Sequence, residues 1–343
     1  MKYIKALLLS LFIIEAFSSE DEVDILNSYN NTDELIKKFP VIYPTTVKPG
    51  LERNIQNRLL TGFENWNRGY EAWKAWGNIL YTQDSIYNVQ GARLSLSQYQ
   101  AAMDVTLKQS KIILGAFYNM VICDDFAAIR YDDTKVIGGK EYPGTVMEFV
   151  KFKDYGEELG TRVVEGWGGT KGSGYDNMIL FQGPEERKIQ EQQDEYMLNY
   201  EFPDTDDLQK KYPILYPSKY QDRTAKDILN IILKGFDSWN QGIDTYIKWT
   251  YEGYDSEAES TYGDNNKRTM TEYRLAMRIL VEKEKIKKLY FDNILIRDNW
   301  AALHYRYTSE DLSTGIKKCG DIMQFLKFEK KDNVLKIVSS WSH

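Results

Sequence analysis

Two short polar pairs end otherwise apolar segments and carry the residue types that could do chemistry. In Arg130-x-Asp132 a carboxylate stands two residues from a guanidinium, and the alternation of a strand would place both on one face. A carboxylate can act as a general base, and a polar pair at the end of an apolar strand face is unusual on the core side of a sheet. The second pair, His304-x-Arg306, adds an imidazole, which can exchange a proton near neutral pH. Arg130, Asp132 and His304 are therefore the candidate catalytic residues.

Each candidate also has a purely structural interpretation. Arg130 and Asp132 could form an ion pair at the rim of a strand. His304 has no obvious orienting carboxylate nearby in the sequence, so it could be a buried histidine whose hydrogen bonds are satisfied. Both interpretations stay open beside the catalytic one.

An internal repeat organises the chain. The segment 33–44, DELIKKFPVIYP, recurs at 206–217 as DDLQKKYPILYP, an offset of 173 residues. The segment 62–69, GFENWNRG, recurs at 235–242 as GFDSWNQG with the same offset. Three further blocks match at offsets of 174 to 176. Collinear blocks with a nearly constant offset indicate a duplicated domain.

Each copy begins with helices and continues with strands. Apolar residues recur at spacings of three and four over 51–73 and over 228–246, which predicts one long helix in each copy. A second helix is predicted to begin at a capping-box pattern, at Ser97 in one copy and at Thr269 in the other. The strand-like runs that follow in the first copy are 112–122, 126–131, 146–152 and 163–167. This order predicts α+β domains with helices on one face of an antiparallel sheet.

Alternation assigns the strand residues to two faces. The face predicted to line a pocket comprises Phe126, Ala128, Arg130 and Asp132 in the first copy and Trp300, Ala302, His304 and Arg306 in the second. The opposite face is apolar as well, with Ile129 and Tyr131. Because an exposed apolar sheet face would be a liability, the two copies are expected to pack as an internal pseudo-dimer.

Short motifs at matching places resemble a known family. Both copies contain Phe-x-x-Trp-Asn-x-Gly in the helix, Asp-(Asp/Asn)-(Phe/Trp)-Ala-Ala at a turn, and (Val/Ile)-Val-x-x-Trp at the close. This pattern resembles the SnoaL-like group of the nuclear transport factor 2 superfamily, twice over. The resemblance implies two tandem cone-shaped domains, each with helices packed in a curved antiparallel sheet around an apolar pocket. Some members are polyketide cyclases, ketosteroid isomerases, dehydratases or epoxide hydrolases, and others bind ligands or proteins.

The resemblance bears on the candidate residues. Arg130-x-Asp132 is similar to the Arg-x-Asp pair of the epoxide-hydrolase members, which also need a second carboxylate from the closing strand. No Asp follows Trp167 here, although Glu148 on the neighbouring strand could substitute. The strand ends of this chain also differ from the Thr-His-Thr of the cyclases.

Aromatic residues are the candidates for ligand binding, because they combine an apolar body with a hydrogen-bonding group. They could equally fill a core. The candidate ligand-binding residues are Trp66, Tyr70, Tyr87, Tyr99, Trp239, Tyr273 and Arg306.

Composition excludes several classes of function. The chain has 343 residues, 42% of them hydrophobic, and a net charge of −7, which indicates a globular protein without the basic face that nucleic acids require. With 2 His and 2 Cys, a zinc site, a Cys-His nucleophile or a Ser-His-Asp triad is disfavoured, and neither metal nor cofactor is expected. Cys123 and Cys319 could form one disulfide between the copies.

The first residues read as a targeting signal. A basic start, an apolar run over 6–14 and the small residues Ala16 and Ser18 predict a signal peptide over 1–18, hence a secreted protein. No later segment is long and apolar enough to span a membrane. The predicted domains are 30–170 and 206–343, joined by a linker over 171–205 that contains a polar helix.

The sequence supports three functions. The leading one is binding of a small hydrophobic ligand in an aromatic-lined pocket. The second is a cofactor-independent lyase, isomerase or hydrolase, with Asp132 as the base and Arg130 orienting it. The third is a scaffold for protein contacts built on the internal pseudo-dimer. Whether the chain is an enzyme is left open.

Overall fold

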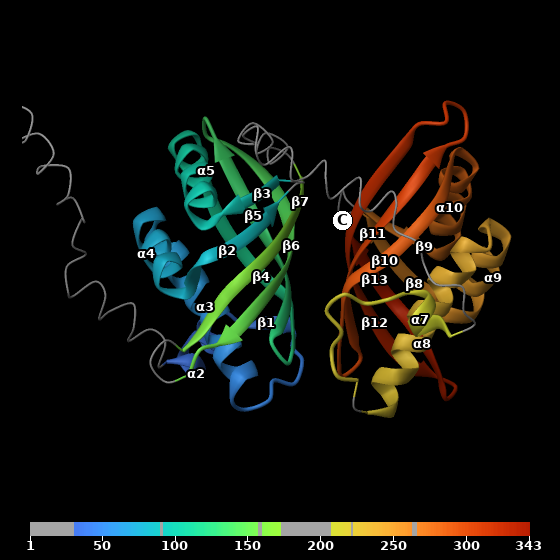
Figure 1. Cartoon of the computed structure of the whole chain (residues 1–343), viewed down its shortest axis with the longest axis horizontal. Helices are drawn as coiled ribbons and strands as arrows, with labels where there is room; N and C mark the ends of the chain where they lie inside the picture. The colour runs from blue at the N-terminus through green and yellow to red at the C-terminus, as the bar shows by residue number, and fades with distance from the viewer. Residues whose placement is uncertain (1–30, 90–91, 157–159, 173–206, 221, 263–265) are drawn as a thin grey trace, which may run out of the picture.

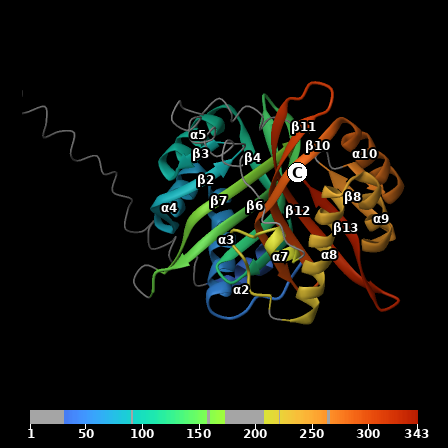
Figure 2. The ribbon, with the colours of Figure 1, turned by 45° about the vertical axis from the view of Figure 1, so that its right-hand side comes forward.

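The computed structural model describes residues 31–89, 92–156, 160–172, 207–220, 222–262 and 266–343. These residues form two α+β domains that follow the repeat and lie side by side (Figures 1 and 2). The predicted signal peptide and the predicted polar helix of the linker lie outside the described residues.

The first domain contains a seven-stranded sheet in the order β1-β4-β5-β6-β7-β2-β3. Its elements are α2 (Thr32–Lys38), β1 (Val41–Tyr43), α3 (Leu51–Arg68), α4 (Tyr70–Leu80), β2 (Tyr81–Val89), β3 (Ala92–Ser95), α5 (Leu96–Gln109), β4 (Lys111–Cys123), β5 (Phe126–Ile137), β6 (Lys140–Asp154) and β7 (Thr161–Gly172). Strands β4 to β7 form the predicted antiparallel meander. Because β1 pairs with β4 and β2 pairs with β7 in parallel, the sheet is mixed rather than antiparallel throughout.

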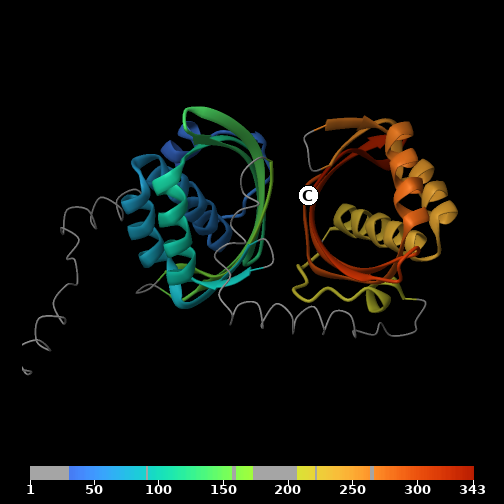
Figure 3. The same ribbon diagram turned by 90° about the horizontal axis from the view of Figure 1, so that it is seen from above.

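The second domain repeats this arrangement with six strands in the order β10-β11-β12-β13-β8-β9. Its elements are α7 (Leu208–Lys211), α8 (Arg223–Asn240), α9 (Ile243–Gly253), β8 (Tyr254–Tyr262), β9 (Asn266–Thr269), α10 (Met270–Lys283), β10 (Glu284–Arg297), β11 (Trp300–Asp311), β12 (Lys317–Lys331) and β13 (Val334–Ser342). Seen from above, each sheet curves around a helix, α3 in one domain and α8 in the other (Figure 3). The predicted pair of cone-shaped α+β domains is confirmed.

Three helix boundaries differ from the sequence prediction. The predicted single helix over 51–73 breaks into α3 and α4 at Gly69, whose φ of 114° is a left-handed value that glycine tolerates. The second copy breaks in the same way at Gly242, with φ 116°. The capping box of α5 is formed by Ser95 rather than Ser97, whereas the capping box predicted at Thr269 is confirmed.

The inner core of each domain forms where the long helix meets the concave face of the sheet. Phe63 on α3 packs against Phe117 and Tyr131, with ring centroids 3.9 and 4.8 Å apart. Phe236 on α8 packs against Tyr305 in the same way, at 4.7 Å. The motif phenylalanine of each copy therefore fastens the helix inside the cone, because burying an aromatic ring is among the larger single contributions to a core.

The convex faces of the two sheets pack against each other. Strands β4 and β5 of the first domain contact β10 of the second, and β4 also contacts β11. The buried residues of this interface are Val121, Cys123, Phe126, Ala128, Met147, Phe149, Trp167, Leu295, Trp300, Ala302, Met323 and Phe325. These apolar faces are thus covered within the chain, as the expected internal pseudo-dimer requires.

Contacts across the interface occur in equivalent pairs, as in a dimer with two-fold symmetry. Tyr43 packs on Trp300 of the other domain, at 5.3 Å, and its repeat counterpart Tyr216 packs on Phe126, at 5.5 Å. Each domain therefore packs a tyrosine, Tyr43 or Tyr216, against the sheet of the other domain.

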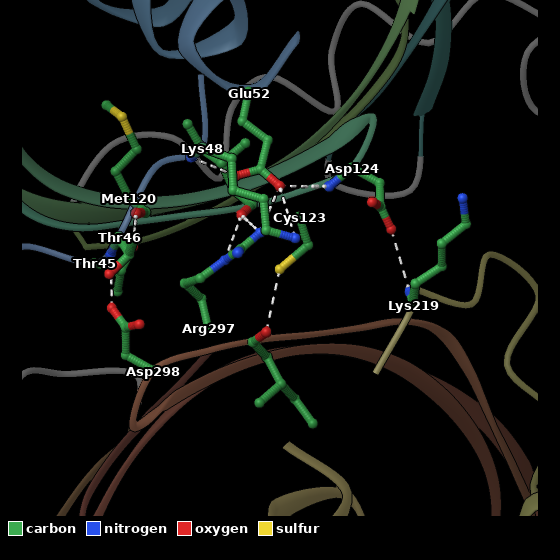
Figure 4. A network of polar contacts seen from close by, with 12 residues as sticks. Thr45, Thr46, Lys48, Glu52, Met120, Cys123, Asp124, Lys219, Arg297 and Asp298 are labelled. Carbon is green, nitrogen blue, oxygen red and sulfur yellow. Dashed lines mark hydrogen bonds and ion pairs between the residues drawn. The ribbon is translucent and has the colours of Figure 1, made fainter. Parts of the chain in front are cut away.

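Polar contacts follow the same symmetry (Figure 4). The backbone N–H of Thr46 donates to Asp298 at 2.6 Å, and that of Lys219 donates to Asp124 at 3.2 Å. An ion pair that only one half makes adds to these contacts: Arg297 Nη2 lies 2.5 Å from Glu52 Oε1. The interface therefore combines a buried apolar centre with directed polar contacts, the composition of a stable interface.

The disulfide that Cys123 and Cys319 could form is absent. The Cys123 thiol is buried and donates to the carbonyl oxygen of Ile296 at 3.3 Å, whereas Cys319 is exposed on β12. Among the described residues, no helix is long and apolar enough to cross a membrane.

Candidate functional site

A cavity of about 120 Å³ lies inside the first domain, between the helices and the concave face of the sheet. That volume exceeds what one water molecule needs and is of the size that admits a small ring compound. Its aromatic lining comprises Phe63, Trp66, Trp73, Trp76, Tyr81, Tyr87, Tyr99, Tyr131 and Phe152. The walls are mostly apolar, as in sites that bind small molecules.

Two carboxyl groups line this aromatic cavity, Glu148 on β6 and Asp133 on β5. The Tyr131 hydroxyl donates to Glu148 Oε1 at 3.0 Å, and Tyr87 also hydrogen-bonds this carboxyl. Burial raises the pKa of Glu148, the two tyrosine hydrogen bonds lower it, and the charge of Asp133 raises it again. The net effect is a raised pKa, which suits a group that both takes up and releases protons.

Tyr87 is held against the closing strand by two glycines. A Cβ on Gly166 would lie 2.6 Å from the Tyr87 ring, and one on Gly168 would lie 2.9 Å from its hydroxyl. Tyr87 also stacks on Tyr99, with ring centroids 4.3 Å apart. Because Gly166 and Gly168 have no side chains, β7 leaves space for the Tyr87 ring to reach Glu148.

A hydrogen-bond donor also belongs to the lining. Trp76 is 7% exposed, and its indole N–H is buried without an acceptor among the described residues. A buried donor of this kind is costly unless something accepts its hydrogen bond. An oxygen atom on a bound molecule would satisfy it.

The predicted pocket face of the strand is wrong in both copies. The cavity is lined by Ile129, Tyr131 and Asp133, whereas Phe126 and Ala128 belong to the interface between the domains. The reason is physical: the second domain covers the convex face, so both faces are apolar. Alternation separates the faces of a strand but does not tell which one is inside.

Of the predicted catalytic pair, Arg130 therefore lies at the interface between the domains, and Asp132 lies on the same face of β5. The Arg130 guanidinium stacks 4.2 Å from the ring centroid of Trp341 in the other domain, and its Nε donates to Asn119 at 2.9 Å. Asp132 accepts a hydrogen bond from the Tyr118 hydroxyl at 2.7 Å. Neither residue lines the cavity, so neither is placed to act on a molecule bound there.

His304 and Arg306 occupy the equivalent places of the second domain. The His304 ring is fully buried and packs against Trp167 of the first domain, with centroids 6.0 Å apart. Its Nε2 lies 2.6 Å from Asp321, while Arg306 pairs with Asp292 at 2.9 Å. His304 lines neither cavity, so it is not placed to act on a molecule bound in one. Its Nδ1 lies 3.8 Å from Asp292 and has no hydrogen-bond partner among the described residues.

His304 predicts a pH dependence of stability. Burial alone lowers the pKa of its imidazole, but the carboxylates Asp321 and Asp292 outweigh burial and raise it, while Arg306 opposes them. A raised pKa in the folded state stabilises the protein below the unfolded pKa of histidine, about 6.5, and this contribution is lost as the pH rises through the folded value.

We therefore expect His304→Gln to flatten the alkaline fall of the thermal unfolding midpoint between pH 6 and 9. Asp321 is exposed, so water screens part of its interaction and a modest slope is expected. An unchanged slope in the variant would contradict this assignment. His343, the other histidine of the chain, serves as the control through His343→Gln.

The aromatic candidates divide between two cavities. Trp66, Tyr87 and Tyr99 line the cavity of the first domain, and Trp239 and Tyr273 line its counterpart in the second. Tyr70 lies outside the lining, where its hydroxyl donates to the carbonyl oxygen of Gln100 at 2.8 Å.

The two carboxyl residues of the site do not follow from the sequence alone. Glu148 is predicted only as a substitute for a missing carboxylate, and Asp133 is not predicted. Ile129, Tyr131 and Asp133 follow one another at every second residue, so this alternation would have placed Asp133 on the face of Ile129 and Tyr131. No group of three or more His, Cys, Asp or Glu side chains able to hold a metal ion occurs in the described part of the chain.

No model of a protein family matches the chain, and no curated protein matches it. Several solved structures do. A ketosteroid isomerase-like protein from Erwinia carotovora shares 10% identity over 36% of this chain and 96% of its own, with a TM-score of 0.30. A SnoaL-like protein from Jannaschia matches at 16% identity over 36% and 90%, with a TM-score of 0.29. An NTF2-like protein from Burkholderia pseudomallei matches at 8% identity over 34% and 89%, with a TM-score of 0.28.

Each of these structures covers about a third of the chain, and matches at such low identity and TM-score say nothing about activity. The activity has to be inferred from the residues of this chain. The two sheets, each curved around its helices, make the chain a tandem of two α+β domains. The solved structures to which it is similar include SnoaL-like and NTF2-like proteins.

Proposed function

We propose that the first domain binds a small apolar molecule and moves a proton on it, with Glu148 as the general acid or base. One observation carries the proposal: a carboxyl group with a raised pKa lines an aromatic cavity and is held there by tyrosine hydroxyls. A titratable group with a shifted pKa inside a cavity is a physical sign of a functional site.

A hydrogen-bond donor of the cavity fits a carbonyl compound. Removing a proton from the carbon next to a carbonyl leaves negative charge on the oxygen, and donors placed in an apolar site stabilise that charge. The unpartnered indole N–H of Trp76 can supply one such donor. The reaction class is therefore a cofactor-independent isomerisation, in which Glu148 takes a proton from one carbon atom and returns it to another.

The test uses 1-indanone, an uncharged bicyclic ketone, as the probe. In D₂O its protons next to the carbonyl exchange for deuterium, and ¹H NMR follows the loss of their signal. We expect the wild-type protein to accelerate this exchange over buffer, with saturation as the probe concentration rises. Exchange at the buffer rate, together with no binding in the first cavity, would contradict the proposal.

Asp133→Asn is expected to move the titration of Glu148 to lower pH. Burial is the main cause of the raised pKa and is unchanged in the variant, but the negative charge of Asp133 adds to it and is lost. The basic form of Glu148 would then persist to lower pH, so the acidic limb of the exchange rate shifts downward on the pH axis. A limb that stays in place would show that Asp133 does not act on Glu148. Asp132→Asn, on the other face of β5, is the control.

We further propose that the protein is secreted, on the strength of its basic start, its apolar run and the small residues Ala16 and Ser18. N-terminal sequencing of protein from the culture medium of the cells that make it is expected to begin at Ser19. Full-length chain retained in the cells would contradict this.

A further inference from the structure

The second domain keeps a cavity at the place equivalent to the site of the first. Its volume is about 110 Å³, close to the 120 Å³ of its counterpart. Its aromatic lining comprises Phe236, Trp239, Tyr246, Trp249, Tyr254, Tyr262, Tyr273, Tyr305 and Tyr307. If the second domain only packed against the first and bound nothing itself, its side chains would be expected to fill this space, because protein interiors normally pack without such voids.

Both carboxyl groups are replaced in this second cavity. Gln324 on β12 pairs with Leu303 as Glu148 on β6 pairs with Ile129, so the amide takes the place of the acid. Tyr307 stands at the position of Asp133, two residues beyond the tyrosine that each copy carries on this strand. The second cavity is therefore close in volume to the first, but its described lining has neither carboxyl group.

The lining of the second cavity carries no charge. Among the described residues that form it, none is Asp, Glu, Lys, Arg or His. Burial raises the pKa of Tyr246, Tyr254, Tyr273 and Tyr305, so these phenols are neutral at any ordinary pH. A charged molecule would have to leave water without finding a counter-charge, which is strongly unfavourable.

One donor of the second cavity is left without an acceptor. The indole N–H of Trp239 is buried and has no hydrogen-bond partner among the described residues. Its counterpart Trp66, in the first domain, donates to the carbonyl oxygen of Ile112 at 3.2 Å. The two tryptophans thus occupy equivalent places on their helices, but only Trp239 has its N–H available to a bound molecule.

We propose that the second domain binds an uncharged aromatic ring compound that carries a hydrogen-bond acceptor, and binds it without chemical change. The aromatic walls accept a flat ring by stacking, and the Trp239 N–H donates a hydrogen bond to an oxygen atom of the compound. The absence of carboxyl groups from the described lining makes this a binding site and not a second catalytic one. This inference does not depend on proton transfer at Glu148.

The test compares four compounds with the same ring system. These are 1-indanone, with an acceptor; indane, without one; indane-1-carboxylate, an anion; and 1-aminoindane, a cation at neutral pH. Binding to the full-length protein is followed by NMR of labelled isoleucine methyl groups. Ile232, Ile322 and Ile337 line the second cavity, whereas Ile112 and Ile129 line the first, so the two sites are read separately.

We expect 1-indanone to shift the methyl signals of the second cavity, indane to do so at about five- to tenfold higher concentration, and the two ions to leave them unchanged. Trp239→Phe removes the donor and keeps an aromatic ring. This variant should weaken the binding of 1-indanone in the second cavity by a similar factor and leave the binding of indane unchanged. Trp66→Phe is the matched control and should leave binding in the second cavity unchanged.

Two results would overturn the proposal. One is no shift of Ile232, Ile322 or Ile337 with either neutral compound; the other is binding of an ion as strong as that of 1-indanone. The ligand series uses the unmodified protein, so it decides the question even if a variant fails to fold. Exchange of 1-indanone protons reports only on the first cavity, so the two proposals fail separately.

Discussion

Glu148→Gln is expected to slow the exchange of 1-indanone protons in D₂O by about 100- to 10,000-fold, the usual contribution of a general acid or base. The amide keeps the size of the side chain and can still accept a hydrogen bond from Tyr131, but it cannot take up a proton at working pH. Binding of 1-indanone in the first cavity should change little, because the aromatic walls are untouched. The loss is therefore predicted in the rate of exchange at saturation.

The matched control lies in the other half of the chain. Gln324→Asn changes the residue that stands in the place of Glu148 and should leave the exchange rate unaltered. If Glu148→Gln retained the wild-type rate, or if Gln324→Asn lost it, the first cavity would not be the site of proton transfer.

Arg297→Ala is expected to lower the free energy of unfolding by about 3–5 kcal/mol, the cost of breaking a buried ion pair by removing one partner. Arg297 reaches from the second domain to Glu52 of the first, at 2.5 Å, and also donates to the carbonyl oxygen of Ile122 at 2.9 Å. Glu52 is 4% exposed, so the variant would leave a carboxylate buried without its main partner. Urea denaturation followed by tryptophan fluorescence measures the change.

An exposed ion pair provides the control for Arg297. Arg53 also lies 2.5 Å from a carboxylate, that of Asp33, but Asp33 is 87% exposed. Arg53→Ala should therefore cost no more than about 1 kcal/mol. A double variant, Arg297→Met with Glu52→Gln, should recover part of the loss because no charge is left buried. Equal effects of Arg297→Ala and Arg53→Ala would show that the domains do not depend on this contact.

The duplication and the α+β order could be predicted from the sequence because they rest on patterns repeated over many residues. Motifs around Phe63 and Phe236 recur because each fastens a helix inside its cone. The break of the long helix at Gly69 could not be predicted from apolar spacing, since the spacing continues through it and only the backbone angle changes.

The position of the site could not be predicted because the docking of the domains decides it. Arg130 and His304 are polar residues on apolar strands, which favoured a site on their face. They instead contact the closing tryptophan of the opposite domain, Trp341 and Trp167 respectively. These two buried polar residues therefore belong to the contact between the two sheets and not to a ligand site.

Once the concave face of each sheet is known to line the cavity, aligning the two copies of the repeat shows how the two cavities differ. Glu148 aligns with Gln324, and Tyr87 between its glycines aligns with Ser260, whose hydroxyl lies 3.0 Å from that of Ser340. The first copy thus gained or kept a tyrosine that holds an acid, while the second has neither. This comparison within one chain supports a division into a reacting site and a binding site.

The ionisation of Glu148 tests this division most directly. ¹³C NMR of its labelled side-chain carboxyl, followed through a pH titration with and without 1-indanone, reports both its pKa and its contact with a bound molecule. We predict a midpoint above the ordinary value of 4.5 that moves when 1-indanone is added. A midpoint at or below 4.5 that does not respond to the probe would contradict an acid and base in the first cavity.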